Sequence, residues 1–199
     1  MRYGKVVSVA LHGIDGIMVE IEIALLQGLP GFEIVGLGDS AIRESKNRIQ
    51  AAIRNSGFNF PSSKITASLA PAWLRKTGSG YDLPLAVAIL IASGQVRLHR
   101  AYQGRWPALF GELSLDGQVR PIPGVFNRVA RCADDGVRHV LLPLANWAEG
   151  RAVGAENLSL LPIDSLKACV DCLHKDPAAL DVPESLTDHE REVSEGLPH

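Results

Sequence analysis

The sequence predicts an α/β or α+β sandwich with a mixed sheet, and three features of the chain lead to this prediction. The first third is rich in β-branched residues and in apolar residues that alternate with polar ones, a pattern typical of strands. Residues 82–94 form one continuous apolar helical stretch that a core has to surround. After it, helical patterns alternate with short apolar runs, as they do in folds whose helices cover a sheet.

Two strand-like runs open the chain, KVVSVALHG and IMVEIEIAL, and the short turn GIDG between them predicts a hairpin. In the second run, Val19, Ile21 and Ile23 alternate with two glutamates, so we expect one face of that strand to meet water. The run GFEIVGL predicts a third strand, and KITASLAP predicts a fourth that ends at Pro71.

A helix is predicted from a cap at Asp39 or Ser40 to about Asn55. Its isoleucines and alanines fall on one apolar stripe, and polar residues occupy the other face, with Lys46 and Arg48 at the flanks. The basic residues of this helix that could lie along a nucleic-acid backbone are Arg43, Lys46 and Arg54. The alternative interpretation is an ordinary solvated helix face.

The second half of the chain starts with the helix over residues 82–94, which has almost no polar face and should be central and buried. The stretch ALFGELSLDGQVRPI predicts two strands around the turn Asp116-Gly117. An amphipathic helix follows from about Gly124 to Asp135. HVLLP and LSLLPI then predict two short strands, and each is followed by a helical segment.

Composition and charge suit one domain with a tail. The chain has 199 residues, of which 46% are hydrophobic and 21% charged, so it can bury a sizeable core. Residues 175–199 contain seven acids and two bases, and we expect them to form an acidic, flexible linker. Residues 1–174 carry 18 bases against 15 acids and form the predicted domain. A mildly basic body permits anionic partners without requiring them.

A cytoplasmic protein with reduced thiols is expected, because MRYGKVVSVALHG lacks the features of a secretory signal. No apolar run approaches the roughly 18 residues that a membrane span requires. Cys169 and Cys172 form a C-x-x-C pair late in a helical stretch, without a second pair, so we interpret them as helix-packing residues rather than a redox or zinc half-site. The six histidines show no metal-binding spacing, and no metal site is expected.

The segment from Gly36 to Ala41 fits G-x-G-x-x-A between a strand and a helix, the pattern of a dinucleotide-binding turn. However, the next strand ends at Pro71 without an acid for the ribose, and Asp39 would place a negative charge where the phosphate should sit. The alternative is a tight turn whose Asp39 caps the helix. No G-x-x-x-x-G-K-[ST] occurs in the chain, so it carries no Walker A loop.

The loop RKTGSGYDLPLAVAIL suggests a second kind of chemistry. Ser79 has a glycine on each side and precedes a helix, so it could be a nucleophile with Lys76 as the neighbouring base. The alternative is a tight turn in which the glycines and Asp82 form the N-cap of the buried helix. Residue types alone leave both interpretations open.

The long segment GLPGFEIVGLGDSAIRESKNRIQAAIRNSGFNFPSSKITASLAPAWLRKTGSGYDLPLAVAILIASGQV resembles the N-terminal domain of the ComM/YifB family, the magnesium-chelatase-like AAA+ ATPases. The resemblance covers roughly residues 1–172. The later block GELSLDGQVRPIPGV is similar to one found in Lon proteases and in the C-terminal domain of RadA. The chain departs from the family pattern at four positions: Gly38 and Arg75 stand where proline is usual, Ser68 where asparagine is usual, and Trp73 where aspartate is usual.

This resemblance implies a Lon-protease-like fold and, for the chain itself, no catalysis. In Lon the active-site serine comes from a G-P-S-A-G loop and the lysine from a later G-G-x-x-x-K, and these positions fall on Gly80 and Arg128 here. Glycine has no nucleophile, and arginine stays protonated and cannot act as a general base.

For the complete family protein, the resemblance implies a hexameric, ATP-driven DNA helicase that acts in branch migration during natural transformation. Residues 175–199 would lead towards the AAA+ module, and ATP and Mg²⁺ are expected only there, with no cofactor in this chain. The expected partners are that module, sister subunits and DNA. The domain itself would pack subunits or contact DNA.

Overall fold

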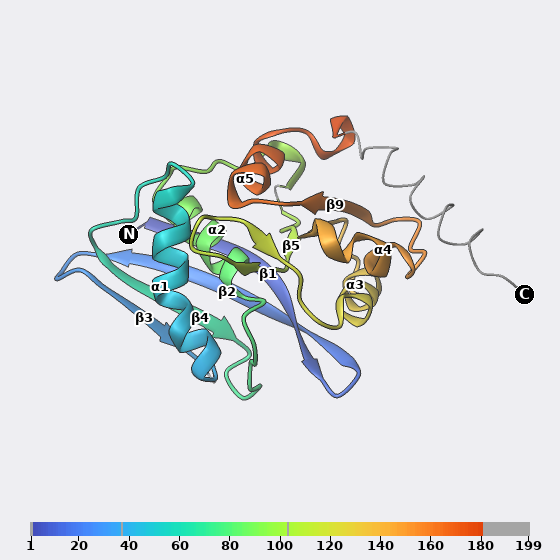
Figure 1. Ribbon diagram of the computed structural model, residues 1–199, viewed down its shortest axis with the longest axis horizontal. Coiled ribbons are helices and arrows are strands. Elements are labelled where there is room, and N and C mark those ends of the chain that lie inside the picture. Colours follow the sequence, from blue (N-terminus) through green and yellow to red (C-terminus); the bar gives the residue numbers. More distant parts are fainter. Residues whose placement is uncertain (1, 37, 103, 181–199) are drawn as a thin grey trace, which may run out of the picture.

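A seven-stranded mixed sheet in the order β3-β4-β2-β1-β5-β8-β9 forms the centre of the molecule (Figure 1). The structure, a computed structural model, describes residues 2–36, 38–102 and 104–180. Most of the predicted tail, residues 181–199, therefore lies outside the described residues.

The first half of the sheet is built from strands β1 to β4. Strands β1 (Arg2–His12) and β2 (Asp15–Leu26) form the predicted antiparallel hairpin. Strand β4 (Lys64–Ala70) runs antiparallel to β2, and β3 (Gly31–Val35) runs parallel to β4 at the edge of the sheet. The buried side chains on β2 alternate with more exposed glutamates, so the predicted two-faced strand is confirmed.

Two helices cover this half. Helix α1 (Ser40–Asn55) begins after the N-cap Asp39 and buries the predicted apolar stripe. Helix α2 (Asp82–Ala92) is buried along almost its whole length, as its uniformly apolar sequence predicts. It approaches β1 closely at Gly4, where an added Cβ would lie 2.8 Å from the backbone nitrogen of Ala92.

The second half adds three short parallel strands to β1: β5 (Ala108–Leu109), β8 (His139–Pro143) and β9 (Ser159–Ile163). Helices α3 (Val125–Asp134), α4 (Trp147–Arg151) and α5 (Leu166–His174) connect and follow these strands. Short 3-10 turns occupy Arg100–Tyr102, Leu144–Asn146 and Pro177–Ala179.

The segment predicted as two strands around Asp116-Gly117 is divided differently in the structure. Strand β5 joins the main sheet, whereas β6 (Glu112–Leu113) and β7 (Val119–Arg120) form a separate small hairpin. The prediction placed the turn correctly and was wrong to treat Ala108 to Leu113 as one strand. At Gly111, between the two parts, φ is +154°, so the chain changes direction there.

Two separate groups of buried side chains lie on opposite faces of the sheet. One includes residues of α1, α2 and α5, and the other includes residues of α3 and α4. The α/β class with a mixed sheet is confirmed, but the half around β8 and β9 has helices on both faces. The expected two-layer arrangement describes the half around β3 and β4, where Thr66 and Ser68 stay partly exposed.

The cysteines have free thiols and belong to the helix-packing regions. Cys169 lies in the larger core, with Cys172 packed against it, and burial raises the pKa of both thiols. Among the described residues, no three His, Cys, Asp or Glu side chains come together in a way that could hold a metal ion. Within the same residues, no helix has the length and apolar character to cross a membrane.

Candidate functional site

The loop between β4 and α2 packs against the start of α1, at the lower end of the molecule in Figure 1. Gly38 forms an isolated β-bridge with Lys76, and the backbone N–H of Asp39 donates to the Lys76 carbonyl at 3.1 Å. The Asp39 carboxylate accepts from the backbone N–H groups of Ile42 and Gly78, each at 3.0 Å. One carboxylate therefore caps α1 and fixes the loop that leads into α2.

The dinucleotide pattern over residues 36–41 lies in the expected topology, since β3 and β4 are parallel and joined by α1. The anion position at the start of α1, however, is filled by the Asp39 carboxylate. Gly36 has φ +114°, and an added Cβ would lie 2.8 Å from the Leu69 carbonyl oxygen, so strand packing alone requires this glycine. A pyrophosphate would have to displace an acid that already serves two backbone N–H groups.

Lys76 and Ser79, the suggested base and nucleophile, use their polar groups on different partners. Lys76 is fully buried, and its ammonium donates to the carbonyl of Leu69 at 2.9 Å and to that of Pro71. Burial lowers the pKa of Lys76. The Ser79 hydroxyl donates to the carboxylate of Glu112 on β6. Within the described chain, no hydrogen bond joins Ser79 to Lys76, so this arrangement does not assemble a dyad.

The positions that correspond to the Lon serine and lysine lie on either side of Tyr81. Gly80 precedes Tyr81, and an added Cβ at Gly80 would meet Ile122 at 3.1 Å. Arg128 on α3 is only 7% exposed and donates to the Val9 carbonyl of β1. Burial lowers the pKa of Arg128 and raises that of Tyr81 to about 12. The arginine therefore joins α3 to β1.

A buried ion pair between α1 and α2 is the main feature that the sequence did not reveal. The Asp82 carboxylate, which has no solvent exposure, accepts from Arg48 Nε at 2.8 Å and from Arg48 Nη2 at 3.2 Å. It also accepts from the backbone N–H of Leu113 at 3.3 Å. Burial outweighs the pairing and raises the pKa of Asp82 to about 6.

One expectation about these residues was wrong. Asp82 does not cap α2, since Tyr81 holds the N-cap position and makes no side-chain cap. Arg48 lies partly exposed at the flank of the polar face, as predicted, but its guanidinium is paired with Asp82. The two residues are 34 positions apart, so no local pattern in the sequence pairs them.

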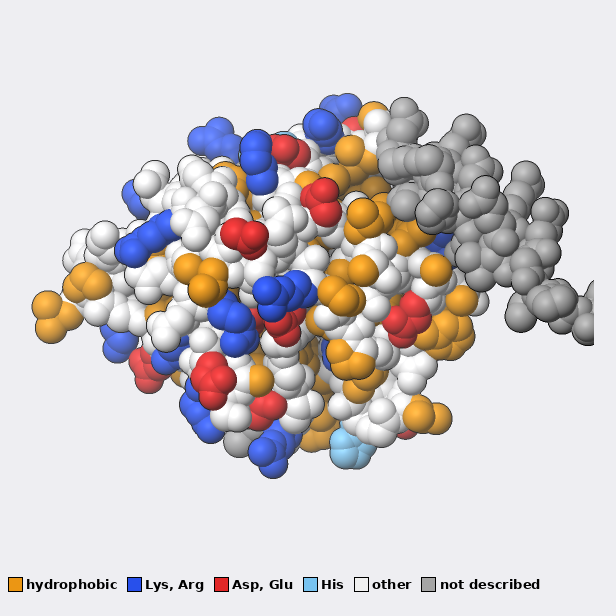
Figure 2. Space-filling model, in the orientation of Figure 1, with side chains coloured by type: hydrophobic (Ala, Val, Ile, Leu, Met, Phe, Trp, Pro, Cys, Tyr) orange, Lys and Arg blue, Asp and Glu red, His pale blue; other side chains and the backbone are white. Residues whose placement is uncertain are grey.

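The three basic residues proposed for DNA contact lie on the outer side of α1, in the region where Figure 2 shows several blue side chains. Arg43 and Arg54 are exposed, and Arg43 Nη1 donates to the Gly38 carbonyl at 3.2 Å. The Lys46 ammonium lies 5.9 Å from the ring centroid of Phe32. None of the three forms an ion pair with another residue that the structure describes.

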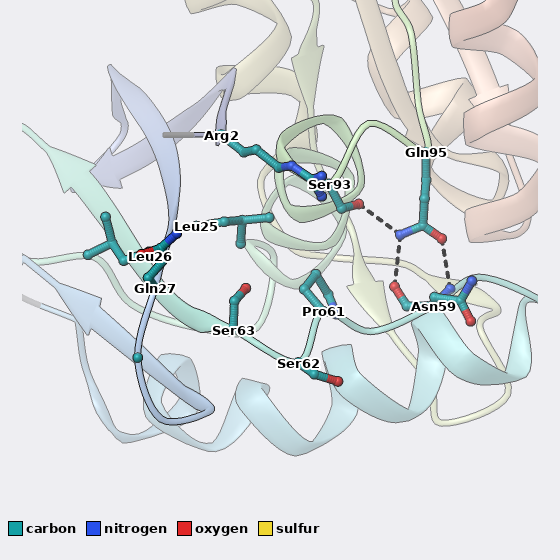
Figure 3. A pocket seen from close by; sticks show the side chains of 11 residues that line it. Arg2, Leu25, Leu26, Gln27, Asn59, Pro61, Ser62, Ser63, Ser93 and Gln95 are labelled. Carbon is teal, nitrogen blue, oxygen red and sulfur yellow. Dashed lines mark hydrogen bonds between the residues drawn. The ribbon is translucent and has the colours of Figure 1, made fainter.

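A separate hollow of about 770 Å³ lies at the opposite end of α2 (Figure 3). Its lining consists mainly of hydroxyl and amide side chains, with Arg2 as its cation. Gln95 accepts from the Asn59 backbone N–H and donates to its carbonyl, both at 2.8 Å, and it donates to the Ser93 hydroxyl at 2.7 Å. The side-chain amide of Gln95 is therefore already hydrogen-bonded within the protein. The hollow also lies at the end of α2 opposite to the loop between β4 and α2.

Comparison with known proteins gives a consistent result. A family model described as subunit ChlI of Mg-chelatase matches residues 19–146. An uncharacterized protein of Mycobacterium tuberculosis is 43% identical over 153 residues, which cover 77% of this chain and 30% of the relative. The YifB protein of Salmonella typhimurium is 39% identical over 149 residues, covering 74% and 28% of the two chains.

The competence protein ComM of Haemophilus influenzae is 36% identical over 157 residues, which cover 79% of this chain and 30% of ComM. This chain thus spans 28–30% of the length of these three relatives. Two Lon proteases match shorter parts, 52–57% of this chain, which supports the Lon-like fold.

Proposed function

The chain belongs to the family of magnesium-chelatase subunit ChlI, as the N-terminal domain of a ComM/YifB-type protein, and we propose that this domain is non-catalytic and contacts DNA through α1. The observation that carries this proposal is the outer face of α1, where Arg43, Lys46 and Arg54 are not committed to acidic partners within the described structure. Packing between subunits is the alternative role for the same face.

The complete protein would be a cytoplasmic, hexameric ATPase that moves DNA branches during natural transformation. ATP and Mg²⁺ would bind outside this chain. These statements rest on the family and on the printed name of ComM, a competence protein. Sister subunits and the protein's own ATPase module would then be the partners of this domain.

The residues at the Lon positions support a non-catalytic role. Gly80 offers no nucleophile, and the guanidinium of Arg128 stays protonated even though burial lowers its pKa. The Ser79 hydroxyl donates to the Glu112 carboxylate, and Lys76, the suggested base, donates to backbone carbonyls. The loop would therefore serve as a scaffold for the start of α2.

Reversing the charge of Arg43, Lys46 and Arg54 together to glutamate is expected to weaken binding of the chain to a DNA duplex by at least tenfold at low salt. Each phosphate contact contributes about 0.9 to the slope of log affinity against log salt concentration, so the slope should fall by about 2 to 3. Fluorescence anisotropy of a labelled duplex, measured across a salt series, gives both values.

The matched control reverses Arg100, Arg105 and Arg138, which are exposed arginines outside α1 and change the net charge by the same amount. This control should lose much less affinity than the α1 variant. If both variants bind DNA as the wild type does, the proposed DNA contact is wrong, and subunit packing is the remaining role for α1.

A serine-reactive fluorophosphonate probe is expected to leave the wild-type chain unlabelled, because the Ser79 hydroxyl donates to the Glu112 carboxylate and the Lys76 ammonium is directed to backbone carbonyls instead. Gel fluorescence and intact mass after incubation with the probe give the result. Labelling of the wild type that disappears in Ser79→Ala but persists in Ser93→Ala would show that Ser79 is an active nucleophile. That outcome would replace the non-catalytic proposal with a hydrolase.

A further inference from the structure

An exposed tryptophan stands in the loop after β4, which packs against the start of α1. The Trp73 side chain is 70% exposed, whereas Trp147 is 7% exposed and Trp106 is partly buried. Arg75, two residues further along the same loop, is also exposed.

The backbone of this loop is hydrogen-bonded within the protein, whereas the side chains of Trp73 and Arg75 are exposed. Burial alternates along it, because Leu74 is 3% exposed and Lys76 is fully buried, while Trp73 and Arg75 are exposed. The Leu74 backbone N–H donates to the Pro71 carbonyl at 3.3 Å, and the Lys76 ammonium donates to the same carbonyl. These two hydrogen bonds stabilise the backbone of the loop, and Trp73 and Arg75 are exposed on it.

A second cation lies close to this loop. Arg43 Nη1 donates to the carbonyl of Gly38, and Gly38 forms a β-bridge with Lys76. The start of α1 and the loop therefore meet at the lower end of the molecule in Figure 1, where Figure 2 also shows blue side chains. Of the nearby acids, Asp39 is turned inwards to two backbone N–H groups, and Glu44 is exposed one residue after Arg43.

We propose that Trp73, together with the exposed cations Arg75 and Arg43, is a base-stacking site for single-stranded nucleic acid. An exposed aromatic ring gives a stacking surface to any unpaired base, and neighbouring cations hold the adjoining phosphates. In a duplex, the bases already stack on one another and cannot reach the ring. This proposal rests on the proposed DNA contact of α1. It adds that the contact prefers single-stranded DNA to a duplex.

The test measures binding of the chain to a fluorescein-labelled oligo(dT) and to a duplex of equal length at low salt. Trp73→Ala is expected to weaken oligo(dT) binding on the order of tenfold, because one base loses its stacking partner. Duplex binding should change by less than about twofold, since it depends on phosphate contacts. Trp73→Phe keeps an aromatic ring and should retain most of the oligo(dT) affinity.

Leu29→Ala is the matched control, because Leu29 is 88% exposed and lies in the loop between β2 and β3. It should bind oligo(dT) as the wild type does. Arg75→Ala should lower the salt slope for oligo(dT) by about 0.7, the contribution of one phosphate of a single strand. Quenching of tryptophan fluorescence by oligo(dT) should be lost in Trp73→Phe.

The outcomes separate this proposal from the one on which it rests. Unchanged oligo(dT) affinity in Trp73→Ala, together with a loss in the α1 charge-reversal variant, would overturn the stacking site and keep the DNA contact. Unchanged affinity in both variants would overturn both proposals. If Trp73→Ala instead reduces self-association in sedimentation and leaves oligo(dT) binding intact, Trp73 is a protein contact and the stacking site is wrong.

Discussion

Gly4→Ala is expected to lower the free energy of unfolding by about 3 kcal/mol or more, at the upper end of overpacking effects. The added methyl group would overlap the Ala88 carbonyl oxygen and lie 2.8 Å from the Ala92 backbone nitrogen. Both atoms belong to the backbone of α2, so no flexible side chain can move aside. The helix would have to shift away from β1 and loosen the larger core. Urea denaturation followed by circular dichroism measures the loss.

Gly31→Ala in the edge strand β3 is the control for this substitution. The nearest atom to its added Cβ is the Leu29 carbonyl oxygen at 4.0 Å, and its φ is not positive. Its free energy of unfolding should change by less than about 1 kcal/mol, the ordinary difference between glycine and alanine in a strand. Equal effects of the two substitutions would show that β1 and α2 are not as close as described.

Asp82→Ala is expected to destabilise the chain by about 3 to 5 kcal/mol, the usual cost of removing one partner of a buried ion pair. The substitution leaves the partly buried Arg48 guanidinium and the Leu113 backbone N–H without their acceptor. The contacts that it breaks join α1, α2 and the β6–β7 hairpin. Thermal and urea denaturation should both show the loss, and Asp82→Asn, which keeps one acceptor oxygen, should lose less.

The same carboxylate gives the chain a specific pH dependence. The pKa of Asp82 is about 6 in the folded chain, whereas an ordinary aspartate, as in the unfolded chain, has a pKa of 3.8. Between these values the folded state binds the proton more tightly, so the wild type gains stability relative to Asp82→Asn as pH falls from about 7 to 4. It loses that gain as pH rises through 6. The difference amounts to about 3 kcal/mol at 1.36 kcal/mol per pKa unit.

Urea denaturation of both proteins at several pH values measures this difference directly, because their other titrating groups are the same. A difference that shrinks as pH falls would contradict the prediction. It would mean that attraction to Arg48 outweighs burial and holds the pKa of Asp82 below its ordinary value.

Periodic patterns in the sequence were enough to predict α1 and α2. Helix α1 has a wide apolar stripe and a capping aspartate, and α2 is apolar all round. The role of each charged residue was harder to predict. Arg43 and Arg48 are both basic residues of α1, yet only Arg48 turns to a buried partner. That difference depends on where Asp82 lies in space, and a helical period carries no information about it.

Neighbourhood in the sequence was also a poor guide to the loop before α2. Lys76 and Ser79 are three residues apart and suggested a dyad, but the lysine turns back to the end of β4. The serine turns to Glu112, 33 residues further along the chain. Side-chain direction in a glycine-rich loop follows from backbone dihedrals and tertiary contacts that residue types alone do not determine.

The order of strands in the sheet has a consequence for how the chain is made on the ribosome. Strands β1 to β4 and helices α1 and α2 all lie within the first 92 residues, whereas β5, β8 and β9 follow later and attach to β1. Until residue 108 has been synthesised, the edge of β1 that becomes the middle of the finished sheet has no partner. The nascent chain therefore passes through a stage in which its most central strand is an open edge, able to pair with another nascent chain.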